Sequence, residues 1–203
     1  MLFKRRQDIK EPFAYRVFGA TLGAVVLFIV EVLQVVIVAA AIIVPVRYFL
    51  IKPFIVRGAS MEPNYYENDY LIIDEVTYRF KDAQRGEIVV FRPPGNESQF
   101  YIKRIIGLPG ETVEILDGVI TVFNSEYPNG TSLSESYIED YTEGHERVIL
   151  GADEYYLLGD NRDSSFDSRK FGPVDEESIV GKVWIRGLPF ERISTFTSPD
   201  YNF

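Results

Sequence analysis

The sequence predicts an all-β fold that follows one N-terminal transmembrane helix. The first observation is a long apolar run near the N-terminus, and the second is a series of short β-rich segments after it with almost no helical periodicity. The third is the length of 203 residues, which suits one domain and an appendage better than two full domains. The 46% of apolar residues and 25% of charged residues are ordinary for a protein that builds a hydrophobic core.

The apolar run covers residues 17–46, which we predict to be a transmembrane anchor. It holds 19 Leu, Ile, Val or Phe residues and a single charged residue, Glu31. These apolar side chains favour insertion by about 6 to 11 kcal/mol, whereas one carboxylate opposes it by about 3 kcal/mol. Glu31 would divide a hairpin into two pieces that are too short to cross a hydrocarbon core of about 30 Å. We therefore expect one span.

The charge around this run predicts its orientation. Residues 1–16 carry five basic and two acidic side chains, and this excess of positive charge favours an N-terminus inside and a C-terminus outside. The alternative is a cleaved secretory signal, for which Ala39–Ala41 offers a site of small residues. However, the apolar run is longer than the roughly 7 to 15 residues of a signal-peptide core. A retained single-pass anchor is the prediction.

Six segments after the anchor are short, rich in β-branched and aromatic residues, and bounded by Gly, Pro, Asn or Asp. They are residues 53–57, 69–73, 87–91, 100–106, 155–158 and 179–185. Residues 112–122 predict a hairpin, because Gly118 after Asp117 tolerates the positive φ that a two-residue turn needs. Only residues 174–179 suggest a helical turn. Residues 123–148 are polar and have no period, which predicts an insertion or a small cap on the β core.

The composition excludes several chemistries. Cysteine is absent, which excludes thiol proteases, disulfide scaffolds and cysteine-ligated zinc. The one histidine, His145, would have to carry any Ser-His-Asp triad, and it lies in an acidic, loop-like stretch. Residues 58–203 carry 13 basic and 27 acidic side chains, so this part should repel nucleic acid. A hydrolase could then use paired carboxylates, a metal held by oxygens, or a Ser or Thr activated by Lys.

Three polar segments favour the last of these chemistries. Ser60 lies in the turn-forming segment 58–64, where small residues leave its hydroxyl and backbone N–H accessible. Lys103 lies among apolar residues in a predicted strand, and burial would lower the pKa of its amine enough for it to act as a base. Residues 159–173 are densely polar, and their Asp and Arg residues suit a hydrogen-bonded scaffold.

Each segment also has an ordinary structural explanation. A serine such as Ser60 is common in turns that contain Gly and Pro, and Lys103 could reach solvent from an edge strand. Residues 159–173 could be a plain turn or a calcium-binding loop. The calcium interpretation is weak, because the segment lacks the Gly and Glu that an EF-hand needs at its sixth and twelfth positions.

Taken together and in this order, the segments resemble those of the bacterial type I signal peptidases, the serine proteases that remove signal peptides from exported preproteins. Gly58-Ala-Ser-Met-Glu-Pro63 is similar to the nucleophile motif of that family, Tyr101 to Gly110 to the lysine motif, and Gly159 to Gly172 to the third motif. Residues 85–91 and 181–184 resemble two of its strands. With gaps, the resemblance covers residues from about 31 to 189.

The resemblance implies a serine–lysine dyad. Ser60 would be the nucleophile, Lys103 the general base, and Ser165 the hydroxyl that orients the lysine amine. The backbone N–H of Ser60 would contribute to the oxyanion hole. Some family members add a serine hydroxyl two residues before the nucleophile, but this chain has Gly58 there, so the second donor stays open. Asn64 stands where Thr is usual, which concerns the geometry of the turn more than the chemistry.

The third motif would support the dyad. Asp167 and Arg169 would form a salt bridge, and Asp160 with Arg162 would brace the same loop. The family fold is a barrel-like β core with a smaller inserted domain, of which residues 123–148 would be a reduced version.

The resemblance also implies a substrate and a location. Preprotein signal peptides and the lipid bilayer would be the partners, with no nucleic acid and no cofactor. A signal peptide would bind in extended form, with small side chains in shallow pockets. The plausible pocket residues are Phe54, Val56, Gly58 and Met61.

In this interpretation the chain has three parts. Residues 1–16 are a cytoplasmic N-terminus, residues 17–46 cross the cytoplasmic (inner) membrane, and residues 53–203 are an extracytoplasmic catalytic β domain. Two rival classes are a membrane-anchored β-domain that only binds and a self-cleaving repressor-type protease. The binding domain would leave Lys103 and the third motif without a role. The repressor type would be expected to carry a DNA-binding domain in place of the membrane span.

Overall fold

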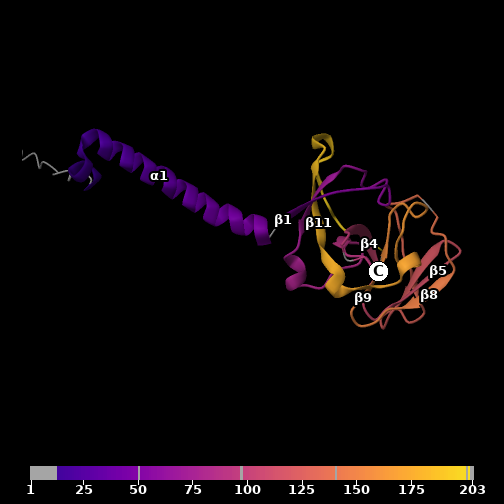
Figure 1. Cartoon of the computed structure of the whole chain (residues 1–203). Coiled ribbons are helices and arrows are strands. Elements are labelled where there is room, and N and C mark those ends of the chain that lie inside the picture. Colours follow the sequence, from indigo (N-terminus) through magenta and orange to yellow (C-terminus); the bar gives the residue numbers. More distant parts are fainter. Residues whose placement is uncertain (1–12, 50, 97, 140, 200, 202–203) are drawn as a thin grey trace, which may run out of the picture. The chain divides into compact units, whose positions relative to one another are not determined.

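A long helix and a β-rich unit follow one another along the chain in the computed structural model (Figure 1). The structure describes residues 13–49, 51–96, 98–139, 141–199 and 201. Residues up to Tyr48 form one unit and residues from Phe49 form the other. Most of the expected cytoplasmic segment, residues 1–16, lies outside the described part.

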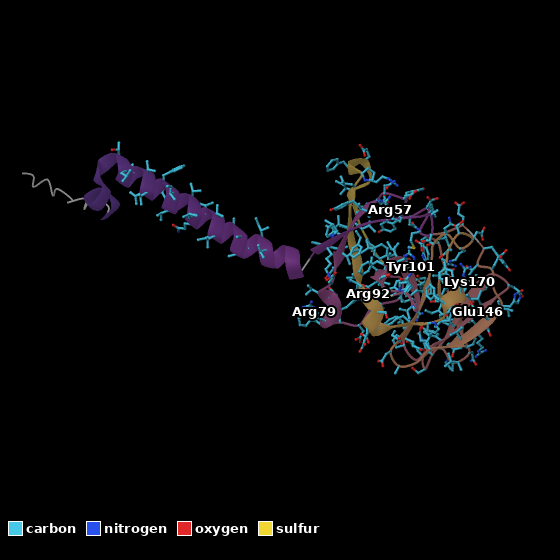
Figure 2. All side chains as sticks on the ribbon, viewed as in Figure 1. Arg57, Arg79, Arg92, Tyr101, Glu146 and Lys170 are labelled. Carbon is cyan, nitrogen blue, oxygen red and sulfur yellow. The ribbon has the colours of Figure 1, made fainter. Side chains whose placement is uncertain are left out.

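The first unit is the helix α1, Phe13–Phe49. Gly19 interrupts its backbone with a φ of 76° and a ψ of 167°. From Thr21 to Val44 the mean hydropathy is 2.9, and the side chains project outward along the helix (Figure 2). Glu31 lies within this stretch and is exposed. The predicted single apolar helix is therefore present, and it is long and apolar enough to cross a membrane.

The second unit is mostly β, as predicted, and its larger sheet curls into a half-barrel (Figure 1). The strand order is β1-β2-β11-β3-β4-β9-β10, with β12 paired to β11, and all pairs are antiparallel. The bounds are β1 Ile51–Ile55, β2 Tyr70–Asp74, β3 Ile88–Phe91, β4 Tyr101–Gly107, β9 Glu154–Leu158, β10 Val174–Asp175, β11 Ile179–Leu188 and β12 Ser194–Thr195.

A smaller sheet has the order β7-β6-β5-β8. Its strands are β5 Thr112–Leu116, β6 Val119–Phe123, β7 Thr131–Ser132 and β8 Glu146–Ile149. The predicted hairpin turn joins β5 to β6, with φ values of 48° at Asp117 and 82° at Gly118. Residues 123–148 are more regular than their composition suggested, because β7 and β8 pair with the two sides of this hairpin.

Short helical turns complete the unit. They are η1 Thr77–Arg79, α2 Ser168–Phe171, η2 Glu176–Ser178 and η3 Phe190–Arg192. The turn η2 confirms the prediction for residues 174–179. The sequence did not predict α2, whose N-cap is Asp167, a residue in the densely polar third motif.

Strand β4 contributes to all three hydrophobic clusters of the β unit. Ile106 belongs to the cluster between the two sheets, Ile105 to a second cluster, and Ile102 packs against a third. The strand is therefore buried on both faces, and Lys103 and Arg104 are only 3% and 2% exposed although they point to opposite faces. A charged side chain in this position needs a partner or must give up its charge.

Candidate active site

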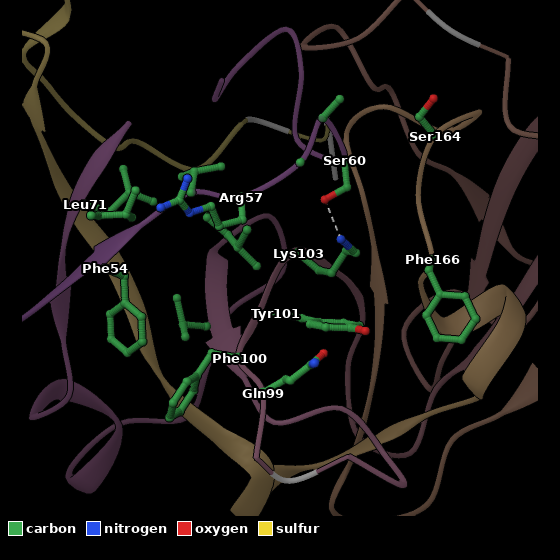
Figure 3. A pocket seen from close by; sticks show the side chains of 16 residues that line it. Phe54, Arg57, Ser60, Leu71, Gln99, Phe100, Tyr101, Lys103, Ser164 and Phe166 are labelled. Carbon is green, nitrogen blue, oxygen red and sulfur yellow. Dashed lines mark hydrogen bonds between the residues drawn. The ribbon is translucent and has the colours of Figure 1, made fainter. Parts of the chain in front are cut away.

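Lys103 and Ser60 meet on the wall of a cavity in the β unit (Figure 3). Nζ of Lys103 and Oγ of Ser60 are 2.7 Å apart and hydrogen-bonded, although the residues are separated by 43 positions in the sequence. Lys103 reaches this point from the middle of β4, and Ser60 from the turn that follows β1. The structure thus brings together the two residues that the sequence analysis singled out as nucleophile and base.

The environment of Lys103 favours a neutral amine. Burial lowers the pKa of Lys103 from its ordinary value of 10.5 to about 8, because the charged form loses its hydration. The carboxylates of Asp167 and Asp160 oppose this change, and the Arg169 guanidinium adds to it. Because burial outweighs the two carboxylates, a large fraction of the Lys103 amine is neutral near pH 8, as a general base requires.

Backbone hydrogen bonds and the hydrophobic core fix the turn that carries Ser60. Gly58 has a φ of 80°, a backbone conformation that glycine adopts without strain. The N–H of Glu62 donates to the carbonyl of Ala59, and the N–H of Tyr65 donates to the carbonyl of Met61. The Met61 side chain is fully buried in the hydrophobic core. Met61 therefore anchors the turn and does not line the cavity, contrary to the expectation from the sequence.

The third motif holds Ser60 through the main chain. The N–H of Asn161 donates to the carbonyl oxygen of Ser60 over 3.1 Å. Within the described residues, the Ser60 N–H donates to no backbone carbonyl. This N–H is therefore available to bind an oxyanion.

Asp160 is the centre of a buried network that links three segments of the chain. Its two carboxylate oxygens accept hydrogen bonds from Arg104, at 2.7 Å from Nε and 2.6 Å from the terminal nitrogen. Nδ2 of Asn64 donates to the same carboxylate over 2.8 Å and to the carbonyl of Tyr137 over 3.0 Å. Asn64 thus connects the turn that carries Ser60 to the third motif. We had expected Asn64 only to adjust the geometry of the turn.

Asp160 and Arg162, which we expected to brace the loop of the third motif, form no ion pair with each other among the described residues. Arg162 instead forms a salt bridge with Glu135, donates to the hydroxyl of Thr142, and donates from Nε to the carbonyl of Gly159 over 3.0 Å. The partner of Asp160 is Arg104, because β4 brings that guanidinium to the carboxylate from the face opposite Lys103. Both residues brace the loop, but each does so through a different partner.

The salt bridge between Asp167 and Arg169 is present. Nε of Arg169 lies 2.9 Å from Oδ1 of Asp167, and the N–H of Gly159 donates to the other oxygen over 3.1 Å. Burial would raise the pKa of Asp167, but these hydrogen bonds and the charge of Arg169 hold it below its ordinary value. Asp167 is therefore a fixed negative charge in the site.

The expected hydrogen bond from Ser165 to Lys103 is absent. The Ser165 hydroxyl is buried against Gly159 and helps to hold the pKa of Asp167 low, yet it has no hydrogen-bond partner of ordinary geometry. A buried hydroxyl without a partner is costly, and Ser165 therefore has hydrogen-bonding capacity that this structure does not use.

The cavity has a volume of about 650 Å³ and a largely apolar wall. Phe54, Val56 and Gly58 line it, as the sequence analysis expected for pocket residues. The other lining residues are Ile55, Arg57, Ala59, Ser60, Leu71, Val90, Gln99, Phe100, Tyr101, Ile102, Lys103, Ser164 and Phe166. A cavity of this size can take an extended peptide segment with several side chains.

The alternative chemistries find less support in the described residues. His145 is exposed and lies 3.2 Å from Asp117 of the hairpin turn, and it makes no contact with Ser60. The described part of the chain holds no group of three His, Cys, Asp or Glu residues that could ligate a metal.

Sequence reasoning missed Arg104, Asn64 and Tyr137. Arg104 had a signal, since a second charge in a strand of apolar residues points to a buried partner, and the strand contains Lys103 and Arg104 side by side. Asn64 and Tyr137 had none, because the contact between residues 73 positions apart depends on how the segment between β7 and β8 folds back.

Comparisons with known proteins show which proteins this chain is similar to. The family profile for Signal peptidase, peptidase S26, matches residues 29–187. The chain is 38% identical over 167 residues to the probable signal peptidase I-2 of Synechocystis sp., covering 78% of this chain and 73% of the relative. It is 32% identical over 182 residues to the signal peptidase IB of Staphylococcus aureus, covering 80% of this chain and 91% of the relative.

Among solved structures, a signal peptidase I from Enterococcus faecalis is similar to this chain. The sequence identity is 35%, the TM-score is 0.43, and the match covers 50% of this chain and 97% of the other.

Proposed function

The chain belongs to the Signal peptidase, peptidase S26, family, and on this premise we propose that it is a membrane-anchored serine endopeptidase with a Ser60/Lys103 dyad. Its substrates are preproteins, from which it removes the N-terminal signal peptide. The observation that carries the dyad is the 2.7 Å contact between Nζ of Lys103 and Oγ of Ser60, made by a lysine whose pKa burial lowers to about 8.

Acylation begins when Oγ of Ser60 attacks the scissile carbonyl carbon. The hydroxyl proton moves to the neutral Nζ of Lys103, and the carbonyl oxygen becomes an oxyanion. When the tetrahedral intermediate collapses, the C–N bond breaks and the Lys103 ammonium gives its proton to the leaving amine. The mature protein departs, and the signal peptide remains as an ester on Ser60.

Deacylation repeats these steps with water. Nζ of Lys103, neutral again, takes a proton from the attacking water and later returns it to Oγ of Ser60. The signal peptide leaves with a new carboxylate. The reaction needs no cofactor, because every proton is taken up and returned by the dyad.

We assign the developing negative charge to the backbone N–H of Ser60, which makes no other backbone hydrogen bond in the described residues. Gly58 has no hydroxyl to add, so a second donor would have to come from another group that lines the site.

Ser165 has its role after proton transfer. The neutral amine accepts from Ser60, but the ammonium form of Lys103 has three N–H donors and needs acceptors. The buried hydroxyl of Ser165 has unused acceptor capacity. We assign it to the Lys103 ammonium, a bond that forms in the catalytic cycle and is absent from the resting structure. Catalytic hydrogen bonds commonly tighten only once substrate is bound.

The supporting ion pairs keep this geometry rigid. Asp167 with Arg169 and Asp160 with Arg104 tie the third motif together and to β4, while Arg162 connects it to the segment that contains Glu135. Rigid positioning matters because the reacting atoms must stay near 3 Å apart.

The substrate enters as an extended strand. Strand β1 lies at the edge of the larger sheet and runs directly into the turn of Ser60, so a peptide can pair with exposed backbone there. Phe54 and Val56 line the adjacent cavity and accept small side chains before the scissile bond.

Helix α1 is the membrane anchor, with residues 58–203 outside the cytoplasmic membrane. Protease added to right-side-out membrane vesicles should degrade this part and spare a tag at Met1. Protection of the C-terminal part would contradict this orientation.

The function is tested with the full chain in detergent and a fluorescent preprotein. Wild-type protein should release the signal peptide at one bond after a small residue, and Ser60→Ala should release none while still binding the peptide. Binding without cleavage by the wild type would identify a binding protein and overturn the proposal.

A further inference from the structure

The cavity beside Ser60 differs in charge from the rest of the molecule. The chain has a net charge of −9, and residues 58–203 carry 27 acidic side chains. Nevertheless, among the residues that the structure describes, no Asp or Glu lines the cavity, whereas Arg57 and Lys103 do. The walls between them are mainly apolar, so they screen charge less than water does.

Arg57 is the fixed positive charge of this cavity. Lys103 acts as a neutral base in the proposed mechanism, with a pKa lowered to about 8, whereas a guanidinium keeps its proton under all ordinary conditions. Arg57 follows β1 and precedes Ser60 by three residues (Figure 3). Its charge therefore lies near Ser60 in the sequence, the residue that attacks the peptide in the proposed mechanism.

The partner of Arg57 is neutral. Its terminal nitrogen donates to Oδ1 of Asn68 over 3.1 Å, and no Asp or Glu of the described residues pairs with it. Asn68 is itself fixed, because its N–H donates to the carbonyl of Val56 over 3.0 Å and its φ is 68°. One N–H of the guanidinium thus holds the side chain in place, and the others can bind a ligand.

We propose that Arg57 binds a carboxylate of the peptide in this cavity. The inference rests on the proposed function, and it names a specificity determinant that the dyad does not require. The planar fork of a guanidinium matches a carboxylate with two parallel hydrogen bonds. Two carboxylates can reach the site: an acidic side chain before the scissile bond, and the new C-terminal carboxylate of the released signal peptide.

Binding is measured on the full chain carrying Ser60→Ala, in nanodiscs of phosphatidylcholine, with fluorescent peptides. The first arm compares peptides that carry Glu, Gln or Lys at each position from the second to the sixth before the scissile bond. The second arm compares the product peptide with a free C-terminal carboxylate and with an amide.

In the first arm, tighter binding of the Glu peptide than of the Gln peptide at one position would show that Arg57 binds an acidic side chain. We expect a difference of about two- to fivefold, the range for exposed ion pairs. The second arm assigns the product carboxylate if that form binds more tightly than the amide. In either arm, Arg57→Gln should remove the difference and Arg57→Glu should reverse it. Arg57→Lys should keep only part of it, because an ammonium keeps the charge but lacks the planar fork. Added salt should weaken the difference.

Arg79→Gln is the matched control. Arg79 is an exposed arginine of the turn η1 and does not line the cavity, so its removal should leave both arms unchanged. Equal loss in Arg79→Gln and Arg57→Gln would overturn the proposal in favour of a general charge effect.

Two further results would overturn it. One is that neither arm shows a difference that depends on Arg57. The other is that Arg57→Gln changes only the affinity for vesicles with phosphatidylglycerol, which would assign Arg57 to lipid phosphate. A preprotein without acidic residues before the scissile bond separates failure of this proposal from failure of the proposed function. If the wild type cleaves it, the proposed function stands even where Arg57 binds no carboxylate, because that cleavage needs only the dyad.

Discussion

The carbonyl oxygen of Ser60 lies 2.5 Å from the position that a Cβ atom would take on Gly159. That distance is too short for any real Cβ contact, so the backbone of Gly159 packs directly against the nucleophile turn. The same space is bounded by the Ser165 side chain. Only glycine lets the third motif approach Ser60 this closely, and Asn161 then donates its N–H to the same carbonyl.

Replacing Gly159 with alanine should displace Ser60. The added methyl group meets backbone, which cannot rotate away, and a shift of the turn by about 1 Å is enough to reduce the rate by roughly 10²-fold. We expect kcat/KM for a preprotein to fall by that order. Gly151→Ala is the control, because its Cβ would meet only the flexible Glu154 side chain, at 3.2 Å. Equal activity of the two variants would show that the contact with Ser60 is unimportant.

Activity should rise with pH and reach half its plateau near the Lys103 pKa of about 8. Below that pH the ammonium cannot accept the Ser60 proton, and above it the amine is neutral. The measurement is single-turnover cleavage across the range, which excludes product release from the profile. A rate that is constant from about pH 6 to pH 10 would contradict a lysine base.

Replacing Asp160 with asparagine should destabilise the β unit. The Arg104 side chain is buried and would lose its compensating charge, a change that costs about 3 to 5 kcal/mol in buried pairs. The melting temperature of the full chain in detergent should fall by roughly 6 to 20 °C.

The control for Asp160→Asn is Glu114→Gln. Glu114 pairs with Arg147 over 3.1 Å, and the arginine side chain is 55% exposed. Loss of such a surface pair costs about 0 to 1 kcal/mol. Similar melting temperatures for the two variants would show that the Arg104–Asp160 pair contributes little to stability.

Ser165→Ala should reduce single-turnover cleavage by roughly 10- to 10³-fold, because the Lys103 ammonium loses an acceptor after proton transfer. A purely structural role predicts a different result. The resting hydroxyl makes no hydrogen bond of ordinary geometry, so its removal should leave the melting temperature close to that of the wild type. Full activity in a folded Ser165→Ala protein would remove Ser165 from the proposed mechanism.

The sequence predicted the longer strands of the larger sheet and the β5–β6 hairpin, because these carry their own local signals, but it missed β7 and β8, which lie in or at the end of a polar stretch without a period. Asp117-Gly118, for example, specified its turn, and the alternating runs on either side specified the hairpin. Ser60 and Lys103 were singled out by the resemblance of three motifs taken together, because a serine in a turn or a lysine in a strand has by itself an ordinary structural explanation.

The partners of the supporting residues were harder to predict. Asp160 and Arg162 were expected to brace one loop without named partners, and their partners Arg104 and Glu135 come from distant segments. Met61 gave no sign of whether it would face the cavity or the core, because the turn after β1 has no periodicity. Such choices depend on tertiary packing.

The substitution Lys103→Arg tests catalysis by the Ser60/Lys103 dyad most directly, because it should abolish cleavage. Arginine keeps the positive charge and much of the stem, but with a pKa above about 12 it cannot accept the Ser60 proton. The control is Lys182→Arg, since Lys182 forms an ion pair with Glu87 over 2.7 Å that an arginine can also make.

The measurement is single-turnover cleavage of a preprotein by each full-length variant, with circular dichroism to verify the fold. Lys103→Arg should be as inactive as Ser60→Ala, the double variant should be no worse than either, and Lys182→Arg should cleave at nearly the wild-type rate. Cleavage by folded Lys103→Arg within about tenfold of the wild type would contradict a lysine general base, because arginine cannot take up the proton.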